Sequence, residues 1–502
     1  MTDVSAPVPG EVYVFPVEQI GKVAACQVLA VDDEHRTVTV TVLDWVGDVI
    51  PEDVSMLAGV GRMVKNFMFW RGSELTCNVS LPVPRGYRRV GVLPVTGDIE
   101  SNSYGGWDFD GEIARQLWWD SLPKDVTARF KASVDSDELV VTPGLVDPET
   151  GGPFETRLRW TTQFSDDARY TISDDFELAS LRSWIVYQVA LHAWRDDLLG
   201  FLEDTPLASD LRLSNHGQQV LDFSRTHLER LSVDVTGLRR LVLPATLSHL
   251  ILHGTPEEPL VVDAAGRGAW LWLYLDGSTY CGLQGLENVS GLRIDRIRDL
   301  SMAGIRQHHP HAKHVMLFGA PGTLQDLPVL AALPDLESLW LCDLFGYTAH
   351  DFPRPDEFVS LNGLDLISVP VDVATWARRV FAKARQVELS VRKPRKPEWL
   401  AENLDNPLRH WDGRDGIPAT VSTKASAAWR TAVKQVRTAT GDDAIVEVVK
   451  AFLGVIRALN QKHAFLYTLE CDEVIDAVNA LTTGLSPEAQ RALDPLIEEA
   501  LD

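Results

Sequence analysis

The feature that most constrains this chain is a recurring apolar-x-apolar core between residues 225 and 395. Each core is too short for a helix, so we expect a β-strand followed by a return segment. Units of this kind bury their apolar residues only by stacking, which predicts one continuous parallel sheet. Successive cores start 19 to 25 residues apart, at Leu231, Leu250, Leu271, Leu292, Val315, Leu339, Leu364 and Val387.

This spacing falls within or near the roughly 20–29 residues of leucine-rich repeats. Two units are the most regular, Leu243–Leu252 and Leu333–Leu341, and both resemble the LPxxLxxLxL core of bacterial repeats. The sequence therefore predicts a leucine-rich-repeat solenoid over residues 225–395, with a parallel sheet on its concave side.

The predicted strands also indicate a binding surface. The leucines of a core face inward, so the residue between them and its two outer neighbours face the concave side. These positions collect aromatic, Met and Arg side chains, the types enriched at binding hot spots. Two alternatives remain open: flanking domains could fold back over this face, or the register could differ by one residue. The predicted partner-binding residues are Trp270, Trp272, Tyr274, Arg293, Asp295, Met316, Phe318 and Trp340.

The flanking sequence predicts a multidomain α+β protein. Residues 1–110 read as a β-rich module, in which Thr37–Val42 alternates polar and apolar side chains as in a half-buried strand. Residues 111–224 read as an α+β connector that caps the solenoid, with strands near 129–142 and 156–164 and helices over 111–120 and Leu178–Leu202. A linker over 396–421 precedes a helical domain, 422–502, with helices expected over 422–438, 442–463, 472–483 and 487–501.

Charge and composition narrow the classes of partner. The net charge of −24 disfavours nucleic-acid binding, which depends on Lys and Arg displacing counterions from phosphates. The N-terminus lacks the features of a secretory signal, and no apolar run approaches the roughly 20 residues of a membrane helix. Five cysteines lie far apart without a CxxC pair. These features predict a cytoplasmic protein with free thiols and no membrane partner.

Motifs for chemistry are sparse. HExxH, GxSxG and a strand-linked GxGxxG are absent, so we expect neither an enzyme nor a cofactor. The histidines of His308–His314 could bind a metal, but no Cys or carboxylate pair lies nearby, and a polar loop is the expected interpretation. Asp108 and Asp110 follow a Gly-rich aromatic loop that could hold them in a pocket. The alternative for this pair is a solvated turn or a partner contact.

The opening segments Pro9–Val17 and Val23–Leu29 are similar to the start of the immunity protein 26 family of bacterial polymorphic-toxin systems. This resemblance covers about residues 9–110 and implies an all-β module that binds and neutralises a cognate toxin. The repeats and the helical C-terminal region resemble an actinobacterial group of leucine-rich-repeat proteins, some of them labelled gliding-motility proteins.

The leading hypothesis is a protein-binding protein, a cytoplasmic immunity factor that neutralises a toxin by occlusion. The runner-up is an adaptor or scaffold that presents a client protein. The third hypothesis is an enzyme that uses its repeats to select a protein substrate, which a pocket with convergent carboxylates would favour.

Overall fold

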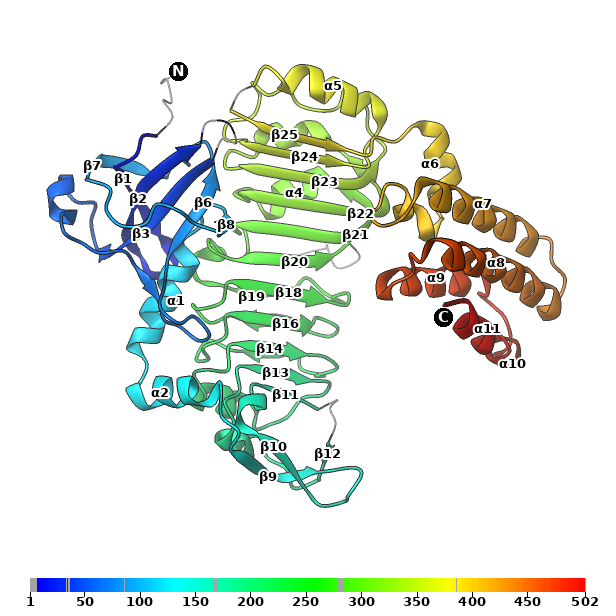
Figure 1. The fold of residues 1–502 in the computed structure, drawn as a ribbon, viewed down its shortest axis with the longest axis horizontal. Helices are drawn as coiled ribbons and strands as arrows, with labels where there is room; N and C mark the ends of the chain where they lie inside the picture. Colours follow the sequence, from blue (N-terminus) through cyan, green and yellow to red (C-terminus); the bar gives the residue numbers. More distant parts are fainter. Residues whose placement is uncertain are drawn as a thin grey trace. The chain divides into compact units, whose positions relative to one another are not determined.

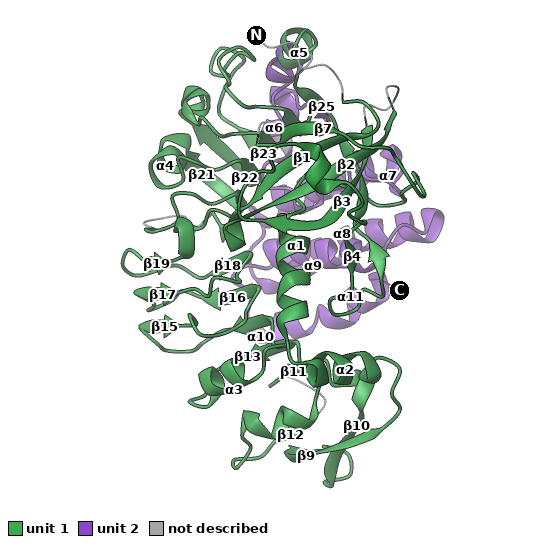
Figure 2. Cartoon of the chain, turned by 90° about the vertical axis from the view of Figure 1, so that its left-hand side faces the viewer, with its two compact units in different colours: residues 1–365, 377–390 green, residues 366–376, 391–502 purple. Residues whose placement is uncertain are grey.

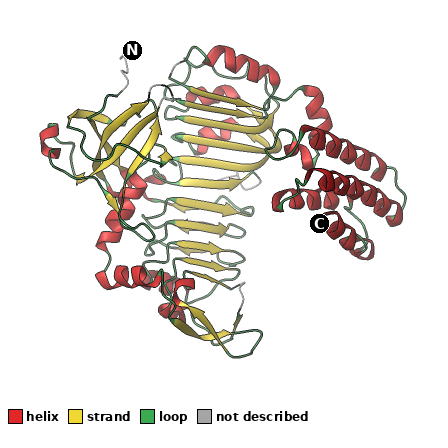
Figure 3. Ribbon diagram, in the orientation of Figure 1, coloured by secondary structure: helices red, strands yellow, loops and turns green. Residues whose placement is uncertain are grey.

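The computed structural model describes residues 7–32, 34, 37–84, 86–166, 170–277, 283–384 and 386–501. It is a mixed α+β protein with a large parallel sheet and helices at the C-terminal end (Figure 3). No sheet formed by these residues closes into a barrel. The chain forms two compact units, residues 1–365 with 377–390 and residues 366–376 with 391–502 (Figure 2).

The N-terminal module is built on a six-stranded sheet with the order β7-β1-β2-β3-β6-β8. All its pairs are antiparallel except β6 with β8. Two short strands and two 3-10 helices complete it: β4 (Val64–Lys65), β5 (Ser73–Glu74), η1 (Glu18–Ile20) and η2 (Val54–Leu57). The six strands are β1 (Glu11–Val17), β2 (Lys22–Asp32), β3 (Thr37–Gly47), β6 (Thr76–Ser80), β7 (Arg88–Val92) and β8 (Tyr104–Gly105).

The alternation expected in β3 is confirmed. Val38, Val40 and Val42 are fully buried, because successive side chains of a strand point to opposite faces. β2 and β3 pair as an antiparallel hairpin, with Asp32 opposite Thr37. The valines pack in one core with Trp107, Phe109 and other residues that follow β8. This core ties the segment after β8 to the sheet.

The segment between the module and the main sheet differs from its prediction in two places. The helix expected near 111–120 is confirmed as α1 (Asp110–Ser121). The strand expected near 129–142 begins only at Leu139, because its first residues belong to helix α2 (Lys124–Ser133), and the strand expected near 156–164 is interrupted by a 3-10 helix over 158–160. A three-stranded sheet with the order β10-β9-β12 follows. Its strands are β9 (Leu139–Val146), β10 (Pro153–Arg157) and β12 (Thr171–Ile172), and 3-10 helix η3 (Leu158–Trp160) follows β10.

The long helix predicted over Leu178–Leu202 is wrong. This segment forms 3-10 helix η4 (Leu178–Ser183), strand β13 (Gln188–Leu191) and helix α3 (Leu198–Asp204). Val189 and Leu191 are buried and pair in register with Leu211 and Leu213 of the next strand. The segment therefore holds another short apolar-x-apolar core, and parallel pairing outweighs its helical spacing of apolar residues.

The large sheet has eleven strands in the order β11-β13-β14-β16-β18-β20-β21-β22-β23-β24-β25, which Figure 1 shows stacked in succession. The pairs from β11 to β23 are parallel. Besides β13, the strands are β11 (Gln163–Ser165), β14 (Asp210–Leu213), β16 (Arg230–Asp234), β18 (His249–His253), β20 (Trp272–Asp276), β21 (Gly291–Ser301), β22 (His314–Gln325), β23 (Ser338–Phe345), β24 (Gly363–Ile367) and β25 (Glu388–Arg392).

Return segments between these strands contribute a second parallel sheet and several short helices. The second sheet has the order β15-β17-β19, with β15 (Val220–Asp222), β17 (Arg240–Val242) and β19 (Val261–Asp263). The helices are η5 (Ala265–Arg267), α4 (Met302–His308), η6 (Leu327–Ala332) and α5 (Val371–Phe381).

From β16 to β23 the predicted leucine ladder is confirmed with one correction, and the last predicted position, Val387, directly precedes β25 instead of lying within it. Leu273, not Leu271, aligns with Leu250 on one side and Leu292 on the other. The run Trp270–Leu275 alternates throughout, so two registers fit the sequence and strand pairing selects the later one. The large sheet also begins at Gln163, three strands before the first predicted core. The paired ladder positions from β16 to β23 are at most 1% exposed: Leu231, Leu250, Leu273, Leu292, Val315 and Leu339.

The C-terminal region is helical, as predicted, but the linker predicted over 396–421 is wrong. This segment forms two helices and the start of a third, and its Leu408 and Trp411 are fully buried in the core of the helical region. The helices of the region are α6 (Pro397–Asn403), η7 (Pro407–Trp411), α7 (Ala419–Val436), α8 (Asp442–His463), α9 (Thr468–Leu481), α10 (Pro487–Arg491) and α11 (Asp494–Leu501). The last predicted helix is split in two, and its first part is capped by Ser486, whose hydroxyl accepts a hydrogen bond from the Ala489 amide. Within the described ranges, every helix is too short or too polar to cross a bilayer.

Candidate functional site

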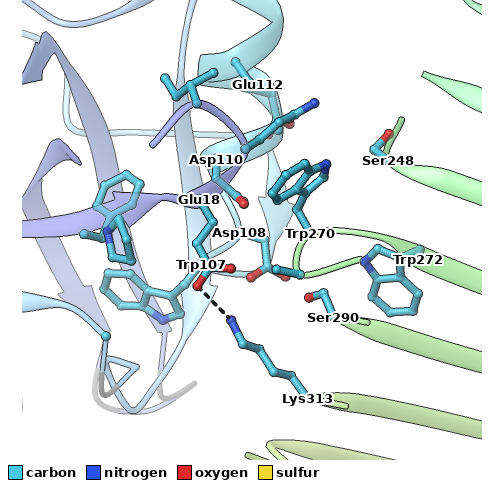
Figure 4. A pocket seen from close by; sticks show the side chains of 18 of the residues that line it. Glu18, Trp107, Asp108, Asp110, Glu112, Ser248, Trp270, Trp272, Ser290 and Lys313 are labelled. Carbon is cyan, nitrogen blue, oxygen red and sulfur yellow. Dashed lines mark ion pairs between the residues drawn. The ribbon is translucent and has the colours of Figure 1, made fainter. Parts of the chain in front are cut away.

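A cleft of about 1050 Å³ lies in the first unit, between the N-terminal module and the large sheet. The module contributes the segment that follows β8 and the first turns of α1. The sheet contributes residues at the start of strands β18 to β22 and in the turns before them. Figure 4 shows Trp107, Asp108 and Asp110 on one side, and Trp270, Trp272 and Lys313 on the other.

The module side is held in place by buried aromatic residues. The indole Nε1 of Trp107 donates a hydrogen bond to the Ser80 carbonyl at 2.8 Å, and the Tyr87 hydroxyl donates to the Trp107 carbonyl. The two rings pack edge to face, with 5.1 Å between their centroids. Trp107 is only 7% exposed, whereas the side chain of Asp108 is 72% exposed. The aromatic anchor thus presents the adjacent carboxylate to the cleft.

The sheet side is a row of residues at one register position. Pairing places His249, Trp272, Gly291, His314 and Ser338 side by side on five successive strands. The Trp272 and His314 rings are stacked, with centroids 5.6 Å apart and an interplanar angle of 4°. A Cβ atom on Gly291 would lie 2.3 Å from the Trp272 ring. Glycine at this position therefore leaves room for the indole to lie flat against the neighbouring strand.

Polar contacts join the two sides. The Arg115 guanidinium on α1 pairs with the buried carboxylate of Glu229, and the Gln19 side-chain amide donates to the Thr246 carbonyl at 3.1 Å. Lys313 Nζ lies 3.8 Å from a carboxylate oxygen of Glu18 (Figure 4). The strongest of these contacts is Arg115 with Glu229, because burial weakens screening by water.

The cleft is strongly acidic. Among its described lining residues, seven carboxylates stand against one lysine and one arginine. A cleft lined by one sign of charge concentrates ligands of the opposite sign, so this one favours cations. The carboxylates are Glu18, Asp108, Asp110, Glu112, Glu229, Asp335 and Glu337.

Several of these carboxyl groups have a raised pKa, because their surroundings disfavour the charged form. Burial raises the pKa of Asp110 to about 6, and repulsion from Asp108 adds to the shift. Burial also raises the pKa of Glu337, where Asp108 and Asp335 act in the same direction and His314 and Lys313 oppose them. A bound cation would relieve this repulsion.

The histidine at the far end of the row carries no charge near neutral pH. Burial lowers the pKa of His249 to about 4, and the positive charges of Arg230 and Arg115 act in the same direction. His249 therefore adds a neutral aromatic ring to the row, and the ring stacks at 6.0 Å from that of Tyr274.

The structure distributes the predicted partner-binding residues over three places. Trp270 and Trp272 line the cleft, although Trp270 precedes β20 and its Nε1 donates to the Leu247 carbonyl at 3.1 Å. All eight residues are partly buried. Tyr274, Arg293, Met316 and Trp340 form the next row across β20 to β23, beyond the cleft lining, and Asp295 and Phe318 lie two residues further along their strands.

Side chains of these outer rows contact one another. Arg293 pairs with Asp295 at 2.9 Å, and its guanidinium lies 4.5 Å from the centre of the Phe318 ring. The N-terminal module covers the part of the sheet at the cleft, as one of the two alternatives anticipated. The N-terminal module therefore covers this sheet face at the cleft, and the outer rows form the part of the face beyond the cleft.

The predicted histidine cluster separates into different environments. His309 is buried with Nδ1 2.9 Å from the Leu286 carbonyl, His311 pairs with Asp335 at 2.8 Å, and His314 lies in the cleft. In the part of the chain that the structure describes, no three His, Cys, Asp or Glu side chains are grouped to hold a metal ion. Cys26, Cys77 and Cys471 are free cysteines, and Cys281 lies outside the described residues.

Sequence reasoning singled out Asp108 and Asp110 as a pocket pair, and both line the cleft. It missed the roles of His249, Gly291 and Glu337. The signal was present, because each of the first two directly precedes a ladder leucine and Glu337 lies two residues before another. The residues that precede the ladder leucines line up across the strands only in the register that places Leu273 in the ladder.

A scan of the chain against protein-family models gave no match, and a search of curated proteins also found none.

Proposed function

We propose that this chain is a protein-binding protein of the leucine-rich-repeat type, and that its leading role is to neutralise a toxin by occlusion. The observation that carries the proposal is the cleft, where the N-terminal module and the large sheet contribute to one surface. Two of the predicted partner-binding residues, Trp270 and Trp272, line it, as do Asp108 and Asp110, which the sequence suggested as a pocket pair.

The fold part of the proposal rests on strand spacing and pairing. Parallel strands recur with a buried ladder, and a second short parallel sheet forms from return segments. This arrangement is typical of a solenoid, in which each unit contacts its neighbours and leaves one face of the sheet for ligands. The exposed parts of that face carry aromatic and Arg side chains, which suit protein recognition.

The test is co-expression of the full chain with a toxin encoded beside it. Occlusion is stoichiometric, so survival should follow the ratio of the two proteins and fail when toxin is in excess. Trp272→Asp should reduce protection, whereas Trp160→Asp, at an exposed tryptophan outside the cleft lining, should not. If the chain neither binds nor protects against such a toxin, the immunity role fails and the adaptor hypothesis replaces it.

One observation favours a second candidate, an enzyme. Asp110 has a pKa of about 6 beside the exposed carboxylate of Asp108, and a pair of this kind can divide the roles of general acid and base. An enzyme would protect at a small fraction of the toxin concentration. Asp110→Asn should then abolish protection without weakening toxin binding, an outcome that occlusion does not allow.

A further inference from the structure

We propose that the cleft binds an arginine side chain on a basic segment of the partner protein, with the guanidinium stacked on Trp272 and paired with Asp108 and Glu337. The proposal rests on the protein-binding role above and specifies the chemistry that the partner presents.

The size of the cleft suits a peptide segment. At about 1050 Å³ it lies just above the range of roughly 300–1000 Å³ for small-molecule pockets. One arginine side chain fills only part of such a space, so neighbouring residues of the segment would occupy the remainder.

The aromatic platform is prepared for a flat cation. Gly291 leaves room for the Trp272 ring, which stacks with His314 and still lines the cleft. A guanidinium stacks on an indole through cation–π attraction, which is strongest for tryptophan.

Carboxylates flank this platform from both sides of the cleft. Asp108 Oδ2 from the module lies 4.0 Å from His314 Nε2, the histidine that stacks on Trp272. Glu337 comes from the turn before β23 and interacts electrostatically with both His314 and Asp108. Asp108 and Glu337 line the same cleft as the stacked rings, and their negative charges oppose each other there.

Arginine fits this arrangement better than lysine. The guanidinium is planar, is less strongly hydrated than an ammonium group, and presents several N–H donors to carboxylates while it stacks. A lysine would meet the charge requirement alone. A comparison of arginine with lysine therefore separates stacking of a planar cation from attraction to charge alone.

The first experiment compares three short peptides by isothermal titration with the full chain. The peptides have blocked ends and the same Gly/Ser background, and carry three arginines, three lysines or three citrullines. Citrulline keeps the shape of arginine and removes its charge. The arginine peptide should bind at least tenfold more tightly than the citrulline peptide and several-fold more tightly than the lysine peptide. Equal binding of the arginine and citrulline peptides would overturn the proposal. Tighter binding of the lysine peptide would overturn the claim that the cleft selects a planar cation.

The second experiment repeats the titration with variants. Glu337→Gln and Trp272→Leu should each weaken binding of the arginine peptide at least fivefold. Gly291→Ala should do the same by displacing the indole, with thermal unfolding recorded for each variant. Glu52→Gln, at an exposed carboxylate outside the cleft lining, should leave affinity unchanged at 150 mM salt. Equal losses in all four variants would indicate unspecific attraction to an acidic chain and overturn the site.

The two proposals fail separately. If a toxin binds the wild-type chain and Glu337→Gln with equal affinity, and the arginine peptide does not bind, the arginine site is wrong and the protein-binding role stands. If the arginine peptide binds as described and no neighbouring toxin does, the arginine site stands and the immunity role fails.

Discussion

The two sides of the cleft differ in how the chain positions them. On the sheet side, Trp272, Gly291 and His314 are placed by backbone pairing on both sides of each strand. On the module side, Asp108 and Asp110 follow an irregular segment that is fixed by the buried side chain of Trp107. Regular strands provide a flat aromatic surface, and the irregular segment provides charge. Substitutions on the two sides should therefore change different properties.

The contact between the sides offers the largest expected effect. Arg115→Met should lower the free energy of unfolding by about 2 to 3 kcal/mol, because it leaves the buried carboxylate of Glu229 without its partner. Burial already raises the pKa of Glu229, and loss of Arg115 removes an opposing contribution. The carboxyl can then take up a proton, so the loss should be larger at pH 8 than at pH 5. Urea unfolding at both pH values measures it.

Glu229→Gln in the same chain provides the control. The double variant should recover part of the lost stability at pH 8, since it removes the unpaired charge. Equal losses in the single and double variants would show that the packing of Arg115 over the Phe67 ring, and not its charge, accounts for the loss of stability.

The aromatic side is tested by Trp272→Ala. The variant should weaken binding of the protein partner by about 2 kcal/mol, the usual cost of removing an aromatic anchor. Its thermal unfolding should stay cooperative, because Trp272 is only partly buried. Titration with the partner and calorimetry of the free variant measure the two quantities. Loss of cooperative unfolding would show instead that the indole belongs to the core.

The charged side is tested by Asp110→Asn. A carboxyl whose pKa is raised by folding prefers its protonated form in the folded state, so its ionisation opposes folding as pH rises from about 4 to above 6. The variant should be more stable than the wild type by about 1 kcal/mol at pH 7.5 and unchanged at pH 4. Urea unfolding with Glu52→Gln as the matched control checks this. The same gain at both pH values would contradict the electrostatic origin.

The same substitution should weaken binding of a cationic peptide. A position whose replacement stabilises the fold and reduces binding is typical of a functional site, where strain or repulsion is retained for the ligand. Affinity of the wild-type chain should also rise between pH 5 and pH 7.5 as Asp110 ionises in the field of Asp108 and Lys313.

The sheet was largely predictable from sequence because its strands are local signals repeated at a regular interval. Leu250 and Leu292 could be placed without knowledge of the rest of the chain. The strand at Val189 was missed because its core is short and overlaps a helical pattern of apolar residues. The cleft was harder, since Asp108 and Trp272 are 164 residues apart and no local pattern indicates that they face one space. The sequence indicated a site only through the residue types, carboxylates near residue 108 and tryptophans near residue 272.

The smallest effect on stability, and a change of opposite sign in binding, is expected for Lys313→Met. Lys313 forms a partly exposed pair with Glu18 at 3.8 Å, and such pairs contribute at most about 1 kcal/mol, so unfolding should change by no more than about 0.5 kcal/mol. Lys313 also lies in the field of Asp110 and Glu337 as a cation of the cleft itself. Without Lys313, no cation of the cleft itself competes with the ligand for these carboxylates. Affinity for the arginine peptide should therefore rise roughly threefold. Glu18→Gln should act in the opposite direction. A decrease in affinity on loss of Lys313 would contradict competition between Lys313 and the peptide for the cleft carboxylates.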